Sequence, residues 1–371
     1  MDESRPLQAM EKLDWLRLIR SENVGPITFR QLIDRFGTAG AALDALPELA
    51  RRGGLRRAIK ICAQSAAERE MAAVDGLGGR MIAQCEPGYP APLGALTDAP
   101  PLISVLGHAH LLERPCIAVV GARNGSANGI RFTERLATEL AAAGFVVASG
   151  LARGIDAAAH RGALEGGTVA VMAGGVDVVY PKENTALYEA IGARGALISE
   201  MRLGLSPQAR HFPNRNRIVS GLAGAVIVIE ATLRSGSLIT ARLAGEQGRD
   251  VLAVPGHPLD PRARGTNKLI REGAVLIEGA DDVLEALGGT SAPQMRAPET
   301  PQLGPPPPSQ AFDEDTVAKA RNEVAGLLGP TPVGQRSSRL SPALVALILL
   351  ELELAGRLQR HPGGQVSLAF D

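Results

Sequence analysis

Two stretches within residues 13–50 have apolar residues every three or four positions, which predicts two amphipathic helices. The residues between them, Asn23-Val24-Gly25-Pro26, are typical of a tight turn because glycine and proline interrupt a helix there. The pattern therefore predicts a helix, a turn and a second helix at the start of the chain.

This first segment leaves two interpretations open. The turn amides and the following helix start could hold a DNA phosphate, as in a helix-hairpin-helix, or the segment could be a plain helical bundle. A cationic run without an acid follows at Arg51, Arg52, Arg56, Arg57 and Lys60. It either contacts a phosphate backbone or forms a solvated helix face, and the solvated face is the simpler interpretation.

From Ile117 the pattern changes to short apolar runs that alternate with amphipathic stretches such as Phe132–Ala143 and Ile239–Gln247. This alternation indicates a parallel sheet with helices on both faces, hence a doubly wound α/β domain that binds ligands at the carboxyl ends of its strands. The predicted strands are Ile117–Val120, Val146–Ser149, Val169–Met172, Ala196–Ser199, Ala225–Glu230, Val251–Val254 and Val275–Ile277.

The carboxy-terminal part is a separate module. Residues 291–310 contain seven prolines and hardly any large apolar residue, which is typical of an extended linker. Beyond it we predict helices at 313–328 and 341–356 and a hairpin at 357–370 around Pro362-Gly363-Gly364, an arrangement that suggests a winged helix. A protein-interaction or dimerisation module is the alternative, because the second helix is unusually apolar and carries few cations.

The predicted domains are therefore a helical domain (1–78), the α/β domain (79–288), a Pro-rich linker (289–311) and a winged-helix-like domain (312–371). The 371 residues are 45% hydrophobic and 21% charged, as in folded soluble proteins. Lys+Arg 39 equals Asp+Glu 39, so nucleic-acid binding requires locally clustered charge.

The expected location is the cytoplasm. Cys62, Cys85 and Cys116 are too few and too scattered for a disulfide framework or a zinc site, which fits a reducing compartment. The amino terminus lacks the apolar stretch of a signal peptide. The longest apolar run, Leu344 to Leu350, is far shorter than the roughly 20 residues that cross a bilayer, so we expect no membrane association.

The loop after the first strand of the α/β domain suits an anion. It runs from Gly121 to Gly129 into a helix, with Arg123 and Ser126 beside the helix start. Its glycine spacing is not the dinucleotide fingerprint, and the second strand ends in Ser149-Gly150 without the acid that binds a ribose. No phosphate-binding loop of the NTPase type is present either, so the sequence predicts no nucleotide cofactor.

The second strand leads into the segment from Ser149 to Asp156 and on to His160. Asp156 is placed to cap the following helix, and His160 one turn later is expected to make a structural hydrogen bond rather than to transfer a proton. His108-x-His110 is the one close histidine pair, and without a neighbouring carboxylate it predicts a surface turn and no metal site.

The segment from His211 to Arg217 is the most informative part of the chain. Arg215 and Arg217, with Arg210 upstream, offer guanidinium groups to phosphates, and Phe212 offers a ring on which a base can stack. Residues 201–273 hold eleven Lys/Arg against five Asp/Glu, a local excess in a neutral protein.

The strand that follows the Arg217 segment is expected to bring further polar groups to the same crevice. Ser235-Gly236-Ser237 opens a helix as a second anion site, and Glu230 is expected to order the loops as a hydrogen-bond acceptor.

These segments, in this order, closely resemble the bacterial DNA-processing family DprA/Smf over roughly residues 115–285. The resemblance rests on Val120-Gly121-Ala122-Arg123, Ser149 to Asp156, Phe212 to Arg217, Ser235 to Thr240 and Val254-Pro255-Gly256. It implies an extended Rossmann-like domain that binds single-stranded DNA without catalysis, forms homodimers and hands incoming DNA to RecA during natural transformation. The flanking helical domain, SAM/helix-hairpin-helix-like, and the winged-helix-like domain agree with that family's arrangement.

Carried over by position, the resemblance implies DNA contacts from several loops. The implied residues are Arg123, Ser126, Ser149, Gly150, Arg215, Arg217, Ser235 and Ser237. Family members often have a cation where Asn124 and Asn214 stand here, a departure that predicts a lower affinity.

Two other functions compete with DNA binding. The first is a Rossmann-like nucleotide phosphoribohydrolase with a phosphate at Gly174-Gly175 and Glu230 acting on the glycosidic bond, but the Pro-Gly-Gly-x-Gly-Thr loop of that class is replaced here by Ala173 to Asp177. The second is a structural interaction protein, against which the basic crevice argues. The sequence thus favours a single-stranded DNA-binding mediator that needs no catalytic residue, metal or cofactor.

Overall fold

The computed structural model describes residues 5–288, 314–328, 333–334, 340–361 and 365–368. The chain forms two compact units. One comprises Met1–Pro6 and Glu70–Thr300, and the other Leu7–Arg69 and Pro301–Asp371.

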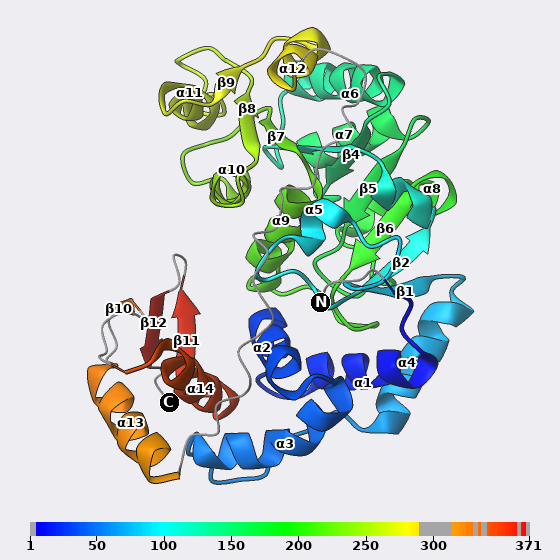
Figure 1. The fold of residues 1–371 in the computed structure, drawn as a ribbon. Helices are drawn as coiled ribbons and strands as arrows, with labels where there is room; N and C mark the ends of the chain where they lie inside the picture. Colours follow the sequence, from blue (N-terminus) through cyan, green and yellow to red (C-terminus); the bar gives the residue numbers. More distant parts are fainter. Residues whose placement is uncertain (1–4, 289–313, 329–332, 335–339, 362–364, 369–371) are drawn as a thin grey trace. The chain divides into compact units, whose positions relative to one another are not determined.

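The larger unit is built on a nine-stranded sheet in the order β1-β2-β6-β5-β4-β3-β7-β8-β9 (Figure 1). The seven strands from β6 to β9 are parallel, and β1 and β2 join the β6 edge as antiparallel strands. The strands are β1 (Arg80–Ala83), β2 (Leu102–Gly107), β3 (Cys116–Val120), β4 (Val146–Ser149), β5 (Thr168–Val171), β6 (Ala196–Ser199), β7 (Ala225–Val228), β8 (Asp250–Ala253) and β9 (Val275–Leu276).

All seven predicted strands are confirmed within about two residues at each end. The predicted strand at 225–230 ends early, at Val228, because Glu230 leaves the sheet to accept hydrogen bonds from Ser126. The sequence did not indicate β1 and β2, which are separated by a segment that includes Pro87 and Pro100.

The strand order places a topological switch between β3 and β7. The chain moves outward from β3 through β4 and β5 to β6, then returns past β3 to β7, β8 and β9. Loops that leave neighbouring strands in opposite directions open a crevice at their carboxyl ends, which is where doubly wound sheets bind ligands. This Rossmann-like topology confirms the predicted fold class.

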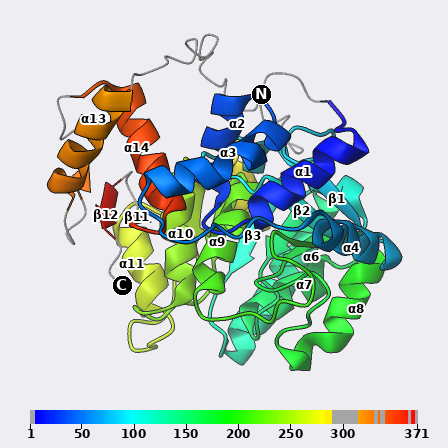
Figure 2. The same ribbon diagram turned by 90° about the horizontal axis from the view of Figure 1, so that it is seen from below.

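Helices cover both faces of the sheet because successive strand residues point to opposite sides (Figure 2). Ile117 and Val119 of β3 pack with residues of α6 and α7, whereas Ala118 and Val120 pack with residues of α9 and α10. The helices and short helical turns of this unit are α5 (Ala91–Gly94), η1 (Ala109–Glu113), α6 (Ala127–Ala142), α7 (Ile155–Ala163), η2 (Lys182–Asn184), α8 (Thr185–Arg194), α9 (His211–Leu222), α10 (Gly236–Glu246), α11 (Arg264–Arg271) and α12 (Ala280–Ala286), and α4 (Gln64–Gly76) spans the division between the units.

The amino-terminal helices are α1 (Ala9–Arg20), α2 (Pro26–Phe36) and α3 (Ala39–Arg52). Asn23 takes a left-handed conformation in the turn, and Pro26 occupies the first position of α2, where its missing N–H is not needed. Trp15 and Phe29 meet edge to face at 4.9 Å in the core. The predicted helix, turn and helix are confirmed.

The cationic run at the end of α3 and beyond it makes ion pairs with nearby acids. Arg51 and Arg52 pair with Glu48, and Arg57 pairs with Glu22. These partners fit the solvated-face interpretation better than a phosphate contact.

The carboxy-terminal segment has the element order of a winged helix: α13 (Glu314–Leu327), β10 (Val333–Gly334), α14 (Pro342–Leu354), β11 (Leu358–His361) and β12 (Gln365–Leu368). The three strands form an antiparallel sheet in the order β10-β12-β11. The predicted linker and the predicted hairpin turn at Pro362-Gly363-Gly364 lie outside the described residues. Within the described part of the chain, no helix has the length and apolar character needed to cross a bilayer.

Candidate nucleic-acid interface

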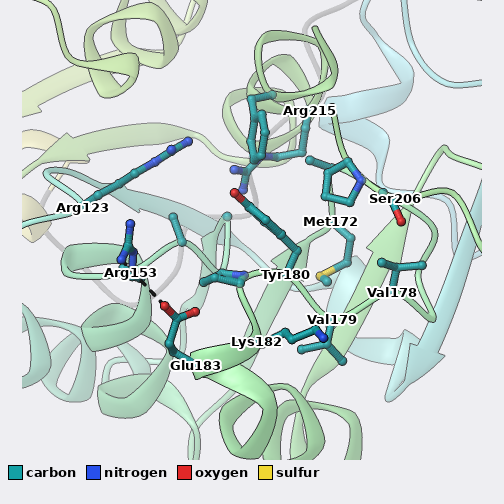
Figure 3. Close-up of a pocket in the computed structure, with 17 residues that line it drawn as sticks. Arg123, Arg153, Met172, Val178, Val179, Tyr180, Lys182, Glu183, Ser206 and Arg215 are labelled. Atoms are coloured by element: carbon teal, nitrogen blue, oxygen red, sulfur yellow. Dashed lines mark ion pairs between the residues drawn. The ribbon is translucent and has the colours of Figure 1, made fainter. Parts of the chain in front are cut away.

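Two cavities adjoin at the switch point of the sheet. The first has a volume of about 650 Å³ and the second of about 680 Å³, and Arg123, Gly150, Phe212 and Arg215 line both. The first also carries the polar side chains Arg153, Tyr180, Lys182, Glu183 and Ser206 (Figure 3). The second also carries Asn124, Asn216, Ser235, Ser237, Thr240 and Arg262. We call the two together the crevice.

An aromatic and cationic cluster lies at the junction of the two cavities. The Phe212 ring is half-buried and lies 5.7 Å from the Tyr180 ring, tilted by 54°. The Arg123 guanidinium lies over the Phe212 ring, 5.1 Å from its centre. Arg123 and Tyr180 are both exposed, so a flat ligand group can reach these side chains.

Arg215 forms the floor of the crevice. It is 5% exposed, and its Nη1 donates to the Val171 carbonyl at 3.2 Å. Any side chain at position 150 would overlap the Arg215 guanidinium, which explains the glycine there. Burial lowers the pKa of Arg215 while the nearby Asp156 carboxylate opposes that change, so the floor keeps a positive charge.

Asp156 and His160 hold the loop after β4 in place. Asp156 is in the first turn of α7, not at its N-cap, and Oδ2 accepts from the Ala152 amide at 3.4 Å. Leu151, at φ 53°, donates its N–H to His160 Nε2 at 3.3 Å, and His160 Nδ1 donates to Thr168 Oγ1 at 2.7 Å. The predicted structural role of His160 is confirmed, and these contacts require a neutral ring.

Burial lowers the pKa of His160 from the usual 6.5 to about 3. As the pH falls below 6.5 the unfolded state binds the proton first, so stability is lost between pH 6.5 and about pH 3. We expect the free energy of unfolding to fall between pH 7 and pH 5 by about 2 kcal/mol more in the wild type than in His160→Gln. Urea titrations at the two pH values measure this difference, and equal pH dependence in the two proteins would contradict it.

Arg217 lies outside both cavities. It is 9% exposed and forms an ion pair with Glu200, while its Nη1 donates to the Asp98 carbonyl at 2.6 Å. The structure thus corrects the predicted DNA contact at Arg217. Residues two apart on a helix point about 200° away from each other, so Arg215 and Arg217 cannot both face the crevice from α9.

Ser126 is also engaged elsewhere. Its backbone N–H donates to Glu230 Oε2 at 2.8 Å, its hydroxyl donates to Glu230 Oε1, and the same hydroxyl accepts from the Gly129 amide as the cap of α6. The Glu230 carboxylate therefore takes the anion position at the start of α6, where the sequence predicted a DNA phosphate. The prediction that Glu230 is a hydrogen-bond acceptor that orders the loops is confirmed, but its predicted place in the crevice is wrong, because it lines a different cavity.

The remaining predicted residues divide into three groups. Ser149 is fully buried and donates to the Val119 carbonyl at 2.6 Å, so its hydroxyl cannot contact DNA. Ser235 caps α10, with its Oγ 2.7 Å from Ser237 Oγ, and both line the second cavity. Arg210 and Asn214 are exposed but line neither cavity.

The sequence analysis missed Arg153, Tyr180, Lys182 and Arg262 as crevice residues. Arg153 stands in a recognised motif, and its exposed side chain lies 3.7 Å from Glu183. The one signal in the sequence for Tyr180 and Lys182 was their place after the third predicted strand.

No metal site accompanies the crevice. Across the described residues, no three His, Cys, Asp or Glu side chains gather to hold an ion. His108 and His110 lie ring to ring at 5.6 Å, and His108 Nε2 lies 3.0 Å from the Ala193 carbonyl.

Comparison with known proteins gives matches over all three parts of the chain. The family model described as DNA recombination-mediator protein A matches residues 80–288, the DprA-like N-terminal HHH domain matches 9–73, and the DprA winged helix domain matches 304–364. Protein Smf of Escherichia coli is 41% identical over 288 residues, which are 76% of this chain and 75% of that protein.

Two solved structures are also similar. DNA processing protein A of Streptococcus pneumoniae aligns with a TM-score of 0.60 at 35% identity and covers 76% of this chain and 98% of its own. DNA processing protein A of Helicobacter pylori, described for its single-stranded DNA binding mode, aligns with a TM-score of 0.51 at 31% identity and covers 54% of this chain and 92% of its own.

Proposed function

The chain belongs to the DprA/Smf family of DNA-processing proteins, and on that premise we propose that it is a non-enzymatic, single-stranded DNA-binding recombination mediator of the cytoplasm. In this proposal it protects incoming DNA and loads RecA onto it during natural transformation. The single-stranded DNA binding mode of the Helicobacter pylori relative supports the choice of ligand.

The observation that carries the proposal is the cluster of Phe212, Tyr180 and Arg123 beside the buried Arg215. A base that stacks on Phe212 gains free energy without being read by sequence, because every base has a flat face. Arg123 can then hold the adjoining phosphate while Arg215 supplies a fixed positive field from below.

The rest of the strand has two routes out of this cluster. In the second cavity, α10 begins at Gly236 beside the hydroxyls of Ser235 and Ser237, and the positive end of the helix dipole there favours a phosphate. In the first cavity, the exposed cations Arg153 and Lys182 can follow the backbone in the other direction. A duplex keeps its bases stacked and paired, so placing one against Phe212 costs the free energy of unpairing and unstacking that base.

The homodimer belongs to the same proposal. The edge strand β9 exposes Val275 and Leu276 at 46% each, and an unpaired apolar edge favours a second copy of the chain. The role of RecA as partner rests on the family relationship alone.

The phosphoribohydrolase alternative needs Gly174 and Glu230 in one site. Gly174 lines the first cavity, whereas Glu230 is bound by Ser126 and lines a different cavity of about 370 Å³. This separation favours DNA binding over glycosidic-bond hydrolysis.

Fluorescence anisotropy with labelled single-stranded and duplex DNA over a salt series tests the proposal. We expect tight binding of the single strand, weaker binding of the duplex, and a log–log salt slope of about −2 if three crevice cations contact phosphates. Equal affinity for the two DNA forms would contradict strand-selective binding, and hydrolysis of nucleoside monophosphates would favour the enzyme.

A further inference from the structure

The helix α14 is apolar around its whole circumference. Its sequence, PALVALILLELEL, has two acids and no cation. A helix buried on one face only shows a single apolar stripe, so an all-round apolar helix is expected to be covered on more than one side. Nine of its residues are buried: Leu344, Val345, Leu347, Ile348, Leu349, Leu350, Glu351, Leu352 and Leu354.

Two different modules cover this helix. One side packs against α13 of its own winged-helix module, and another packs against α3 and α2 of the amino-terminal helices, within one compact unit (Figure 2). In a winged helix the element at this position is the recognition helix, which enters the major groove when such a module binds DNA. Here protein lies against it.

Gly53, at the end of α3, makes the closest approach. A side chain at this position would overlap the Glu351 carbonyl and meet the Ala355 methyl group. Its φ of −68° and ψ of −8° are helical, so the backbone itself does not require glycine. The glycine is required by the contact between α3 and α14.

Polar contacts at the carboxyl end of α14 fix the register of this packing. The Asn23 side-chain amide donates to the Leu354 carbonyl at 3.0 Å, which satisfies one of the carbonyls that a helix end leaves open. Arg357 Nη1 donates to the Gly53 carbonyl at 3.4 Å, and Arg360 Nη2 donates to the Gln31 side chain at 3.3 Å. Three residues of the winged-helix module thus meet three of the helical module.

A buried charge lies at the same contact. The Glu351 side chain is fully buried, and Arg321 Nη2 holds one of its oxygens at 2.7 Å. Arg35 of α2 is exposed. Desolvation lowers its pKa, and the Glu351 charge opposes that change. Arg321 of α13 therefore pairs with this carboxylate, while Arg35 of α2 interacts with it through charge alone.

We propose that α14 is an intramolecular docking element, held by α2 and α3 of the same chain, and that the winged-helix module does not read DNA with it. A recognition helix without a single Lys or Arg offers no cation to a phosphate, and α3 and α2 already pack against this one. The contacts at Gly53, Asn23 and Arg357 select the helical module as its partner.

Hydrogen–deuterium exchange of the full-length protein tests the docking. Gly53→Ala keeps a residue that favours a helix but forces α3 and α14 apart, so we expect amides in segments 49–57 and 350–357 to exchange at least tenfold faster than in the wild type. Gly326→Ala, in α13 with open space around it, is the matched control and should leave both segments unchanged. Arg357→Ala removes a contact without adding bulk and should change the same segments in the same direction.

Unchanged exchange in both Gly53→Ala and Arg357→Ala would overturn the docking. Duplex DNA affinity provides the second measurement, and it should be equal in wild type, Gly53→Ala and Gly326→Ala. A gain of duplex affinity in Gly53→Ala would show a masked DNA reader and overturn the proposal. Conversion of a dimer into a monomer by Gly53→Ala, seen by light scattering, would mean that a second copy supplies α3, which also contradicts docking within one chain.

Discussion

Replacing Arg217 with alanine is expected to lower the free energy of unfolding by about 3–5 kcal/mol, because it leaves a buried carboxylate without its cation. The Arg217 and Glu200 side chains are only 11% and 13% exposed, so water cannot replace the lost partner. The Asp98 carbonyl loses a donor at the same time. Urea unfolding of wild type and variant measures the difference.

The matched control removes both charges. Arg217→Met with Glu200→Gln keeps much of the volume without burying an unpaired ion, so we expect it to recover at least half of the lost stability. An Arg217→Ala variant of unchanged stability that fails to bind single-stranded DNA would contradict this account, since Arg217 would then act on DNA directly.

Replacing Phe212 with alanine is expected to weaken single-stranded DNA binding by about 5- to 150-fold, the equivalent of about 1–3 kcal/mol for one stacked base. The ring is half-buried at the mouth of the crevice, with Tyr180 on one side and Arg123 over it. Its loss removes the stacking surface and the cation–π contact that positions Arg123. Anisotropy titration at one salt concentration gives the ratio of dissociation constants.

Phe212→Tyr keeps the ring and should bind within about twofold of the wild type, whereas Phe212→Leu keeps apolar bulk without a π face and should resemble alanine. Salt slopes should be alike in all four proteins because each keeps the same number of cations in the crevice. If alanine and wild type bind equally well, the base does not lie on Phe212.

The sequence was sufficient for the seven parallel strands because each is a short apolar run between loops, as at Val146–Ser149. It did not indicate β1 and β2, which are held by pairing with one another and with β6 rather than by a local pattern. A short stretch of sequence does not show which distant segment a strand will pair with.

The sequence predicted the location of the crevice but not all of the residues that line it. Phe212 and Arg123 were identified because their chemistry is visible in single residues. Ser126 and Arg217 are also residue types that bind phosphates, but Ser126 donates to Glu230 and Arg217 pairs with Glu200. These two acids lie 104 and 17 residues away in the sequence, so the motifs do not reveal them. The orientation of α9 about its axis decides which of Arg215 and Arg217 faces the ligand, and the motif does not reveal it.

The salt dependence of single-stranded DNA affinity in wild type and Arg123→Ala tests the central claim, that this crevice holds the strand, most directly. Arg123 is exposed and, among the described residues, forms no ion pair with an acid, so its replacement should leave the fold intact. If it binds a phosphate, the variant should bind more weakly and its log–log slope should be shallower by about 0.7. If wild type and Arg123→Ala have the same affinity and the same salt slope, the claim is contradicted and the DNA binds elsewhere on the protein.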